Sequence, residues 1–269
     1  MDDKKIIEML KINPYALEQI EFPTERMCMT ALKENGAVLQ FIKNPTLEMQ
    51  ELAVNKNPAA IQYIDNPPEY MLNEAVQDSW SNLDYVKNPS ERLIRIGIEQ
   101  SGWALKYAQE PSEELQLLAV KKNYDAIKYI ENPSPQVQMA AVEENYEALR
   151  YIQQPAYEVA CAAIKDYPQA LRLLVDVDKA KFLAFLALNV LVLKYMPTGL
   201  GIATSEVEAV LQEVLSKEDV AEGYVRDFVN CKEIEPGSKV FPVDKLTLVY
   251  KYGSNRAKRI TVDQKLKVK

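Results

Sequence analysis

The sequence predicts a mainly α-helical protein, a right-handed α-solenoid of about nine 22-residue two-helix repeats followed by a small α+β cap. Three residue types recur every 22 residues, without insertion or deletion, from residue 1 to about residue 198. Such a period is typical of units that bury apolar surface only against their neighbours. Proline opens a unit, a small residue stands at place nine, and Asn or Ser stands at place thirteen. The series are Pro23, Pro45, Pro67, Pro89, Pro111, Pro133 and Pro155; Ala31, Ala53, Ala75, Gly97, Ala119, Ala141 and Ala163; and Asn13, Asn35, Asn57, Ser79, Ser101, Asn123, Asn145 and Asn189.

Each unit is expected to form two short helices. In the fifth unit, Asn88 is expected to cap the first helix, Pro89 suits its first position and Glu91 can close a capping box. In the sixth unit, Asn123 is expected to end the first helix in the left-handed conformation. A second helix follows directly, and the Asn-Pro that opens the next unit stops it.

Two further places of the unit predict packing. Places five, nine and ten share one helix face and are expected to be buried, as in Leu115, Ala119 and Val120. Place nineteen is aromatic in most units: Phe41, Tyr63, Tyr85, Tyr107, Tyr129, Tyr151 and Tyr195. These rings are expected to pack between units with the hydroxyl at the rim, in preference to reading nucleic-acid bases by stacking.

The two ends of the array depart from the pattern, as end units of a repeat stack do. The first unit lacks the proline turn, and the ninth, from Val177, is more apolar. Its run from Phe182 to Met196 is too short for a membrane span and is expected to form a buried helix pair. The predicted boundaries are 1–198 for the repeat domain and 199–269 for the C-terminal module, and neither a signal peptide nor a membrane segment is expected.

The C-terminal module is expected to combine helices with a small sheet. Residues 205–217 and 218–230 have the pattern of amphipathic helices, with Ser205 and Glu208 at capping-box spacing. Alternation then predicts strands, with Leu246, Leu248, Tyr250 and Tyr252 on one face and returns at 259–262 and 266–268. The module is expected to close the end of the array, and its basic strands are candidates for an acidic partner or a dimer edge.

The unit resembles a family of uncharacterised short helical repeats. The shared pattern is Asn-Pro-Ser, Gln at place six, Ala-Val at nine and ten, Asn at thirteen, Ala-Ile at sixteen and seventeen, and Tyr-Ile at nineteen and twenty. The sixth unit departs from it only at Glu110, where the opening Asn would stand, and the seventh keeps that Asn at Asn132. Such repeats occur in phage, giant-virus and intracellular-bacterial proteins and are similar to variant leucine-rich and HEAT-like arrays. The resemblance covers about residues 1–198 and implies an α-solenoid used for recognition, with no catalytic residues to transfer.

Composition narrows the chemistry. The 269-residue chain contains no histidine, which removes Ser-His-Asp and Cys-His catalysis and the usual imidazole zinc sites. Cys28, Cys161 and Cys231 are far apart in sequence, so free thiols in a reducing compartment are favoured over disulfides or a metal site. No Gly-rich phosphate loop occurs, and the acidic pairs lack a convergent partner. We therefore expect a cytoplasmic protein that is no enzyme and takes no cofactor or metal.

Place eighteen carries the sharpest surface pattern. It is acidic or neutral in the first four units and cationic in the next five, at Lys106, Lys128, Arg150, Arg172 and Lys194. Stacked units would align these cations along a path suited to an acidic peptide or a phosphate backbone. The alternative is a self-paired face, since Asp125 precedes Lys128 and Glu147 precedes Arg150 by three residues.

The fourth and fifth units deviate together at their inter-helix turns. Ser79-Trp80 and Ser101-Gly102-Trp103 replace the Asn-containing turn and bring in the chain's two tryptophans. Trp80 and Trp103 are candidates for a binding hot spot or for filling an altered core.

Charge is distributed unevenly along the chain, and three functional hypotheses remain. Residues 232–269 hold ten Lys or Arg and four Asp or Glu, a net charge of +6, which leaves −13 for residues 1–231. The first hypothesis is a protein-interaction scaffold, which acts on a host factor if virus-encoded, with Trp80, Trp103 and the five cations as contacts. The alternatives are nucleic-acid or polyanion binding through the basic residues, and a structural component of a larger assembly.

Overall fold

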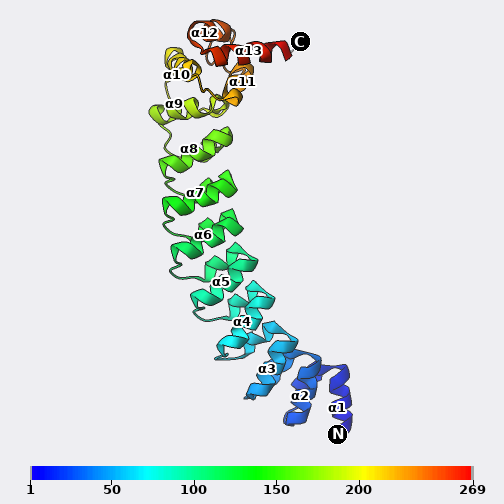
Figure 1. Ribbon diagram of the computed structural model, residues 1–269. Helices are drawn as coiled ribbons and strands as arrows, with labels where there is room; N and C mark the ends of the chain where they lie inside the picture. The colour runs from blue at the N-terminus through cyan, green and yellow to red at the C-terminus, as the bar shows by residue number, and fades with distance from the viewer. Residues whose placement is uncertain (1, 268–269) are drawn as a thin grey trace. The chain divides into compact units, whose positions relative to one another are not determined.

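The computed structural model describes residues 2–267 and divides into two compact units, residues 1–131 and 132–269, each described here by itself. Within both units, ten-residue α-helices alternate with six-residue 3₁₀-helices. Figure 1 shows the α-helices of the first unit stacked in chain order. Its elements are α1 (Asp3–Ile12), η1 (Pro14–Gln19), α2 (Glu25–Glu34), η2 (Gly36–Phe41), α3 (Leu47–Lys56), η3 (Pro58–Tyr63), α4 (Glu69–Asp78), η4 (Trp80–Tyr85), α5 (Glu91–Gln100), η5 (Gly102–Tyr107), α6 (Glu113–Lys122) and η6 (Tyr124–Tyr129).

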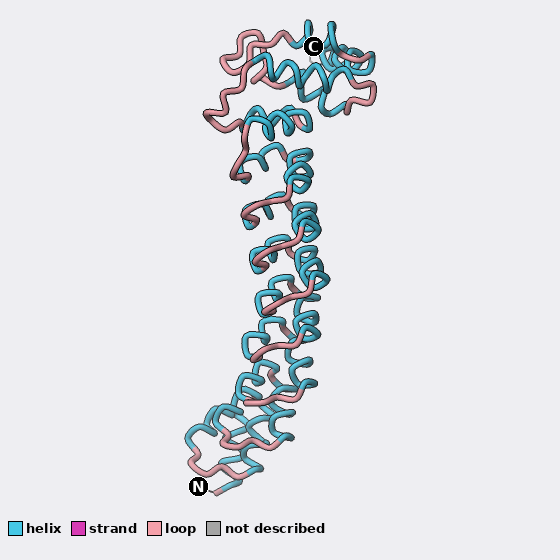
Figure 2. The backbone as a smooth tube through the Cα atoms, turned by 90° about the vertical axis from the view of Figure 1, so that its left-hand side faces the viewer, coloured by secondary structure: helices cyan, strands magenta, loops and turns pink. Residues whose placement is uncertain are grey.

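The second unit continues the alternation and ends in a helical region. The tube in Figure 2 follows helices and loops, with no strand among the described residues. Nine repeats are thus followed by four further helices. The elements are α7 (Pro135–Glu144), η7 (Tyr146–Tyr151), α8 (Tyr157–Asp166), η8 (Pro168–Leu173), α9 (Lys179–Leu188), η9 (Val190–Tyr195), α10 (Thr204–Ser216), α11 (Glu222–Asn230), α12 (Lys245–Tyr252) and α13 (Asn255–Lys267).

The caps of the repeat lie elsewhere than predicted. Asn88 does not cap α5: its φ of 52° is left-handed, and Ser90 is the N-cap, its hydroxyl accepting from the Leu93 N–H. Pro89 therefore precedes the N-cap, and Glu91 takes the first helical position that was predicted for Pro89. Four other units use the same hydroxyl cap, at Thr24, Thr46, Ser112 and Ser134.

The left-handed cap predicted at place thirteen is also wrong. Asn123 has a φ of −144° and is extended, as Asn35 and Asn145 are. An extended residue turns the chain from the α-helix into the 3₁₀-helix, and the Asn side chain can then satisfy the free amides of the second helix. Asn35 does so for the Ala37 N–H at 2.9 Å.

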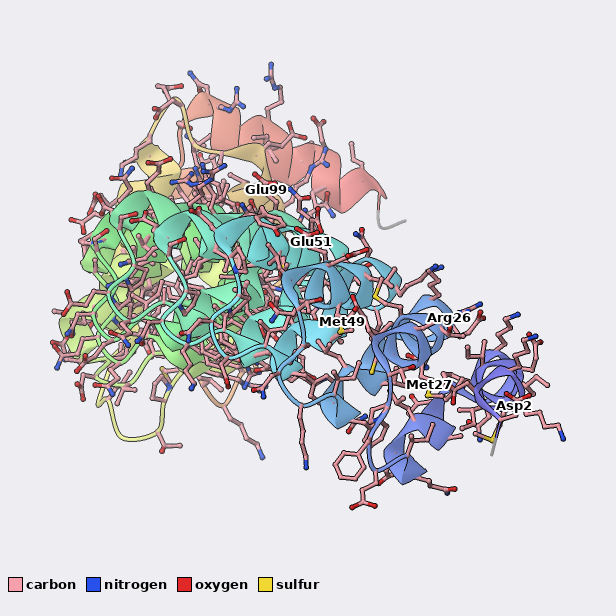
Figure 3. The ribbon with its side chains drawn as sticks, turned by 90° about the horizontal axis from the view of Figure 1, so that it is seen from below. Asp2, Arg26, Met27, Met49, Glu51 and Glu99 are labelled. Carbon is pink, nitrogen blue, oxygen red and sulfur yellow. The ribbon has the colours of Figure 1, made fainter. Side chains whose placement is uncertain are left out.

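The predicted buried face is confirmed in the core of both units. Leu115, Ala119 and Val120 are fully buried. In Figure 3, Met27 and Met49 hold place five of consecutive repeats and are buried, whereas Arg26 beside Met27 is exposed. The run from Phe182 to Met196 forms α9 and η9, as expected, and no helix among residues 2–267 is long and apolar enough to cross a membrane.

The predicted strands of the C-terminal module are helices, so an α+β cap is wrong. The sequence 246–252 lies in α12, and 259–262 lies in α13; Val268 lies outside the described residues. Asp244 starts α12 by accepting from the amides of Leu246 and Thr247. Because Leu248 and Val249 are buried while Tyr250 is exposed, the buried face follows the helical period rather than alternation. In the part of the chain that the structure describes, strand-like pairing is limited to an isolated bridge between Ile234 and Phe241. The two predicted amphipathic helices are α10 and α11.

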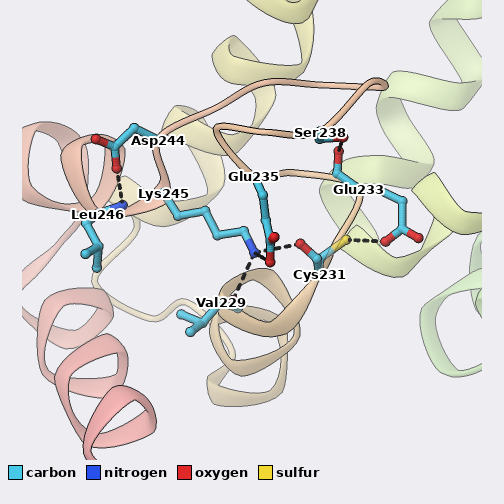
Figure 4. Close-up of polar contacts among 8 residues, drawn as sticks. All are labelled: Val229, Cys231, Glu233, Glu235, Ser238, Asp244, Lys245 and Leu246. Carbon is cyan, nitrogen blue, oxygen red and sulfur yellow. Dashed lines mark hydrogen bonds and ion pairs between the residues drawn. The ribbon is translucent and has the colours of Figure 1, made fainter. Parts of the chain in front are cut away.

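A buried lysine ties α12 to α11. The Lys245 ammonium donates to the carbonyl oxygens of Val229 and Cys231, at 2.9 and 2.6 Å, and lies 3.9 Å from a Glu235 carboxylate oxygen (Figure 4). These carbonyls belong to the C-terminal end of α11, where a cation is favoured. Burial lowers the pKa of Lys245, and Glu235 opposes that shift. Cys231 and the other two cysteines are free thiols.

Candidate functional site

The candidate site lies on three consecutive 3₁₀-helices of the first unit, η4, η5 and η6. A 3₁₀-helix has three residues per turn, so places fifteen and eighteen of a repeat lie one above the other on the same face. The stacked helices therefore bring two such pairs side by side, Trp103 with Lys106 and Asp125 with Lys128. We call the following set the aromatic–lysine face: Trp80, Asp84, Trp103, Lys106, Tyr107, Asp125, Lys128 and Tyr129.

Trp80 and Lys106 form the first half of this face. The Lys106 ammonium lies 5.5 Å from the centre of the Trp80 ring and 4.5 Å from that of Tyr107, as in a cation–π contact. Its nitrogen is 3.7 Å from an Asp84 carboxylate oxygen, which also accepts a hydrogen bond from the Tyr107 hydroxyl. The contacts with Tyr107 and Asp84 raise the pKa of Lys106 against the effect of burial.

Trp103 and Lys128 form the second half of the face, where the carboxylate belongs to the same repeat as the lysine. The Trp103 indole N–H donates to Asp125 at 2.7 Å, and Lys128 donates to the other Asp125 oxygen at 3.0 Å. The Lys128 ammonium lies 5.6 Å from the centre of the Trp103 ring and 5.1 Å from that of Tyr129. Burial alone would raise the pKa of Asp125, but the hydrogen bonds from Trp103 and Lys128 hold it below its ordinary value.

Backbone contacts hold both tryptophans in place. Where Ser79 replaces the usual Asn, Gln100 of the next unit accepts from the Trp80 N–H at 2.9 Å and donates to the Val76 carbonyl at 2.6 Å. Next to Trp103, the Gly102 N–H donates to the Asn123 side chain at 2.8 Å. The deviating turns thus keep the contacts between units and place an indole at the surface.

The face is accessible and electrically balanced. Trp103 is 40% exposed and Tyr129 38% exposed, while Trp80 is half-buried. Each lysine has its own carboxylate, so the face holds two full positive and two full negative charges. An arrangement of fixed aromatic rings with charged groups beside them suits a peptide better than a polyanion.

The five predicted cations do not behave alike. Lys106 and Lys128 belong to the face just described, and the predicted pair of Arg150 with Glu147 is present at 3.5 Å. Arg172 lies 4.7 Å from the centre of the Tyr195 ring, and neither it nor Lys194 takes part in an ion pair of the described residues. The second-unit cations are thus partly unpaired, unlike those of the first.

The contact between a tryptophan and the lysine of the next repeat is not evident from the sequence pattern. Lys106 follows Trp80 by 26 residues and Lys128 follows Trp103 by 25. One repeat plus one 3₁₀ turn is 25 residues, so the spacing of Trp103 and Lys128 becomes a signal once the second helix is known to be 3₁₀. Trp80 stands at place fourteen, one residue earlier in its repeat than Trp103, so its spacing to Lys106 is 26. The tyrosines of place nineteen are half-buried or exposed, as Tyr107 and Tyr129 are, rather than core residues.

No protein-family model, curated protein or solved structure matches this chain. What it binds is therefore inferred from its own side chains.

Proposed function

We propose that this chain is a non-enzymatic protein-interaction scaffold whose aromatic–lysine face binds an extended segment of a partner protein. The exposed, hydrogen-bonded indole of Trp103 carries the proposal. Tryptophan is enriched at binding hot spots because a large rigid ring buries much apolar area at little cost in conformational entropy. Its Nε1–H already has a partner in Asp125, so a ligand can cover the ring without leaving a buried donor unpaired.

The charges beside the rings indicate the chemistry of the partner. Lys106 and Lys128 are held over aromatic rings with their ammonium groups beside carboxylates, so little side-chain entropy remains to be lost on binding. A segment with apolar side chains for the rings and an acidic group for one lysine fits this face. The lysines then contribute mainly to orientation and specificity.

A second candidate is binding of a nucleic acid or another polyanion. It is favoured by the unpaired Arg172 and Lys194 and by α13, where Arg256, Arg259 and Lys265 are exposed. A steep loss of binding with salt would support it, because displaced counterions dominate such affinities. Charge reversal at Arg150 and Arg172 that leaves binding unchanged would exclude the second-unit cations.

The same proposal extends to the setting of the protein. We place it among the short helical repeats that its units resemble, as a right-handed α-solenoid, and in the cytoplasm, or in the host cytoplasm if it is virus-encoded and acts on a host factor. The three free thiols agree with a reducing compartment. The pattern of the sixth unit supports the family assignment.

The test is affinity capture with tagged protein from a lysate of the native or infected cell, with and without nuclease. The wild type is compared with Trp80→Ala/Trp103→Ala and with the control Tyr70→Ala/Leu118→Ala, which removes exposed side chains from the α-helices of the same unit. Circular dichroism confirms that both variants fold. The proposal expects a nuclease-resistant protein that the tryptophan variant loses and the control keeps. Recovery of nuclease-sensitive material alone would favour the second candidate. Equal capture of the partner by both variants would refute binding at the aromatic–lysine face.

A further inference from the structure

The first unit carries a groove lined by both apolar and acidic side chains, formed by η1, α2, η2 and the start of α3. It has a volume of about 570 Å³ and includes Ile20, Phe22, Phe41 and Ile42 in its lining. Phe22 is 84% exposed, which is costly for a ring of this size in water. An exposed aromatic at an open groove marks an interaction surface rather than a core.

The groove is lined by three carboxylate side chains and one basic side chain. Glu18, Glu21 and Glu25 belong to the lining, and Lys43 is its one basic residue. No ion pair of the described residues involves these three carboxylates. The groove therefore fits a segment that combines apolar side chains with positive charge.

The helix α13 has this chemistry. Arg259, Val262 and Leu266 lie at spacings of three and four residues and share one exposed helix face, with Val262 57% and Leu266 65% exposed. The opposite face, with Ala257 and Ile260, is buried in the second unit. Residues 255–267 contain five Lys or Arg and one Asp. The exposed face of α13 is thus complementary to the groove in both charge and hydrophobicity.

We propose that the groove of one copy binds the exposed face of α13 of a second copy. Val262 and Leu266 pack against Phe22 and the other apolar groove residues, in the manner of a helix lying in a groove, and Arg259 pairs with the glutamates of the groove. Because the two surfaces differ, the contact is head-to-tail, and each bound copy still offers a free groove or a free α13. Self-association then continues into chains or rings, as a structural component of a larger assembly would require.

Sedimentation velocity at low salt, from about 1 to about 100 μM protein, tests the contact because that range brackets micromolar affinity. Three variants are needed: Glu21→Arg/Glu25→Arg for the groove, Arg259→Glu/Lys265→Glu for α13, and Glu143→Lys/Glu144→Lys as a control. The control changes the net charge as the groove variant does, on exposed carboxylates outside both surfaces. The wild type and the control are expected to grow beyond two chains with concentration. The groove and α13 variants are each expected to associate at least about tenfold more weakly, because the contact brings like charges together.

Mixing gives the decisive result. The native α13 of the groove variant matches the native groove of the α13 variant, and the reversed α13 matches the reversed groove. An equimolar mixture of the two variants is therefore expected to recover growth beyond two chains. The four substitutions combined in one chain restore the charge match and are expected to restore growth. A wild type that stays a single chain at every concentration, a mixture that stays monomeric, or association that persists in both variants would overturn the proposal. The Trp80→Ala/Trp103→Ala variant should assemble as the wild type does, so failure of self-association leaves the partner-binding face untouched.

Discussion

In the repeats the same few contacts recur every 22 residues, whereas in the C-terminal helices each polar contact is made once. A repeat is held by a small residue at place nine, a hydroxyl cap and a place-thirteen side chain. The C-terminal region depends on single contacts: Lys245 to the end of α11, the Tyr224 hydroxyl to the Leu186 carbonyl, and Arg256 to the Val220 carbonyl. Loss of one contact is thus shared among neighbours in the repeats and concentrated in the C-terminal region. Single substitutions in the two regions should therefore differ in how much unfolding free energy they remove.

The largest effect is expected at Lys245. Lys245→Met leaves two carbonyl acceptors without their donor in a buried place, which should lower the free energy of unfolding by about 3 kcal/mol. Hydrogen exchange should show the loss confined to α11 and α12. The control Lys251→Met, on the exposed side of the same helix, is expected to stay within about 0.5 kcal/mol of the wild type. An equal loss in both variants would mean that Lys245 does not tie the two helices together.

A smaller loss is expected from overpacking in the repeats. A Cβ at Gly102 would lie 2.2 Å from the Ala119 carbonyl oxygen, so Gly102→Ala must push η5 away from α6. Other repeats hold larger residues at this place, the fourteenth, which shows that neighbouring helices can separate. We therefore expect the free energy of unfolding to fall by about 1–3 kcal/mol, measured by chemical denaturation. Gly223→Ala is the control, because nothing lies within 4 Å of its Cβ and Ala favours a helix. The comparison fails if Gly102→Ala costs no more than this control.

Removal of one place-thirteen side chain should lower the free energy of unfolding by less than overpacking does. Asn189 donates to the Ile164 and Lys165 carbonyls at the end of α8 and accepts from the Leu191 N–H. Asn189→Ala is expected to lower the free energy of unfolding by about 1–2 kcal/mol. Asn55→Ala, at an exposed position of α3, should be neutral or slightly stabilising. If thermal unfolding of the two variants were the same, the side chains of place thirteen would not hold units together.

These two regions also differ in how far sequence alone predicts them. The repeats were predictable because nine copies of one pattern average out local ambiguity, although the 3₁₀ form of the second helix and the caps were not. The sequence from Leu246 to Tyr252 alternates, yet its buried residues are the adjacent Leu248 and Val249, because the segment is a helix that packs on α10 and α13. Only the tertiary structure reveals that packing. The sequence predicts a surface position for Lys245, because nothing in its neighbouring residues indicates that a lysine is buried there.

The candidate site was predicted in part. The pairing of Asp125 with Lys128 and of Glu147 with Arg150 follows from their spacing of three, and the two tryptophans stand out as departures from the repeat. That Lys106 lies over Trp80 was not predictable without knowing which residues of adjacent units face each other. The sequence also could not tell that Lys106 is balanced by Asp84 of the preceding repeat, whereas Arg172 takes part in no ion pair of the described residues.

The smallest expected effect is an acid titration within the aromatic–lysine face. The folded-state pKa of Asp125 lies below its unfolded value, so its stabilising contribution is complete above the unfolded pKa and is lost as pH falls through the folded pKa. In a Trp80→Phe background, Trp103 fluorescence should change with a midpoint below the ordinary value of 3.8. Asp125→Asn is the control and should abolish the transition. A midpoint at or above 3.8 would contradict the hydrogen bonds assigned to this carboxylate.

Hydrogen-exchange mass spectrometry of the captured complex tests whether the aromatic–lysine face binds a protein partner. Free and bound protein are compared peptide by peptide over residues 2–267. The account predicts slower exchange on binding in η4, η5 and η6, with η1 and η2 unchanged, and no such protection when the Trp80→Ala/Trp103→Ala variant is mixed with the partner. Protection that appears elsewhere and leaves 80–129 unchanged would contradict it.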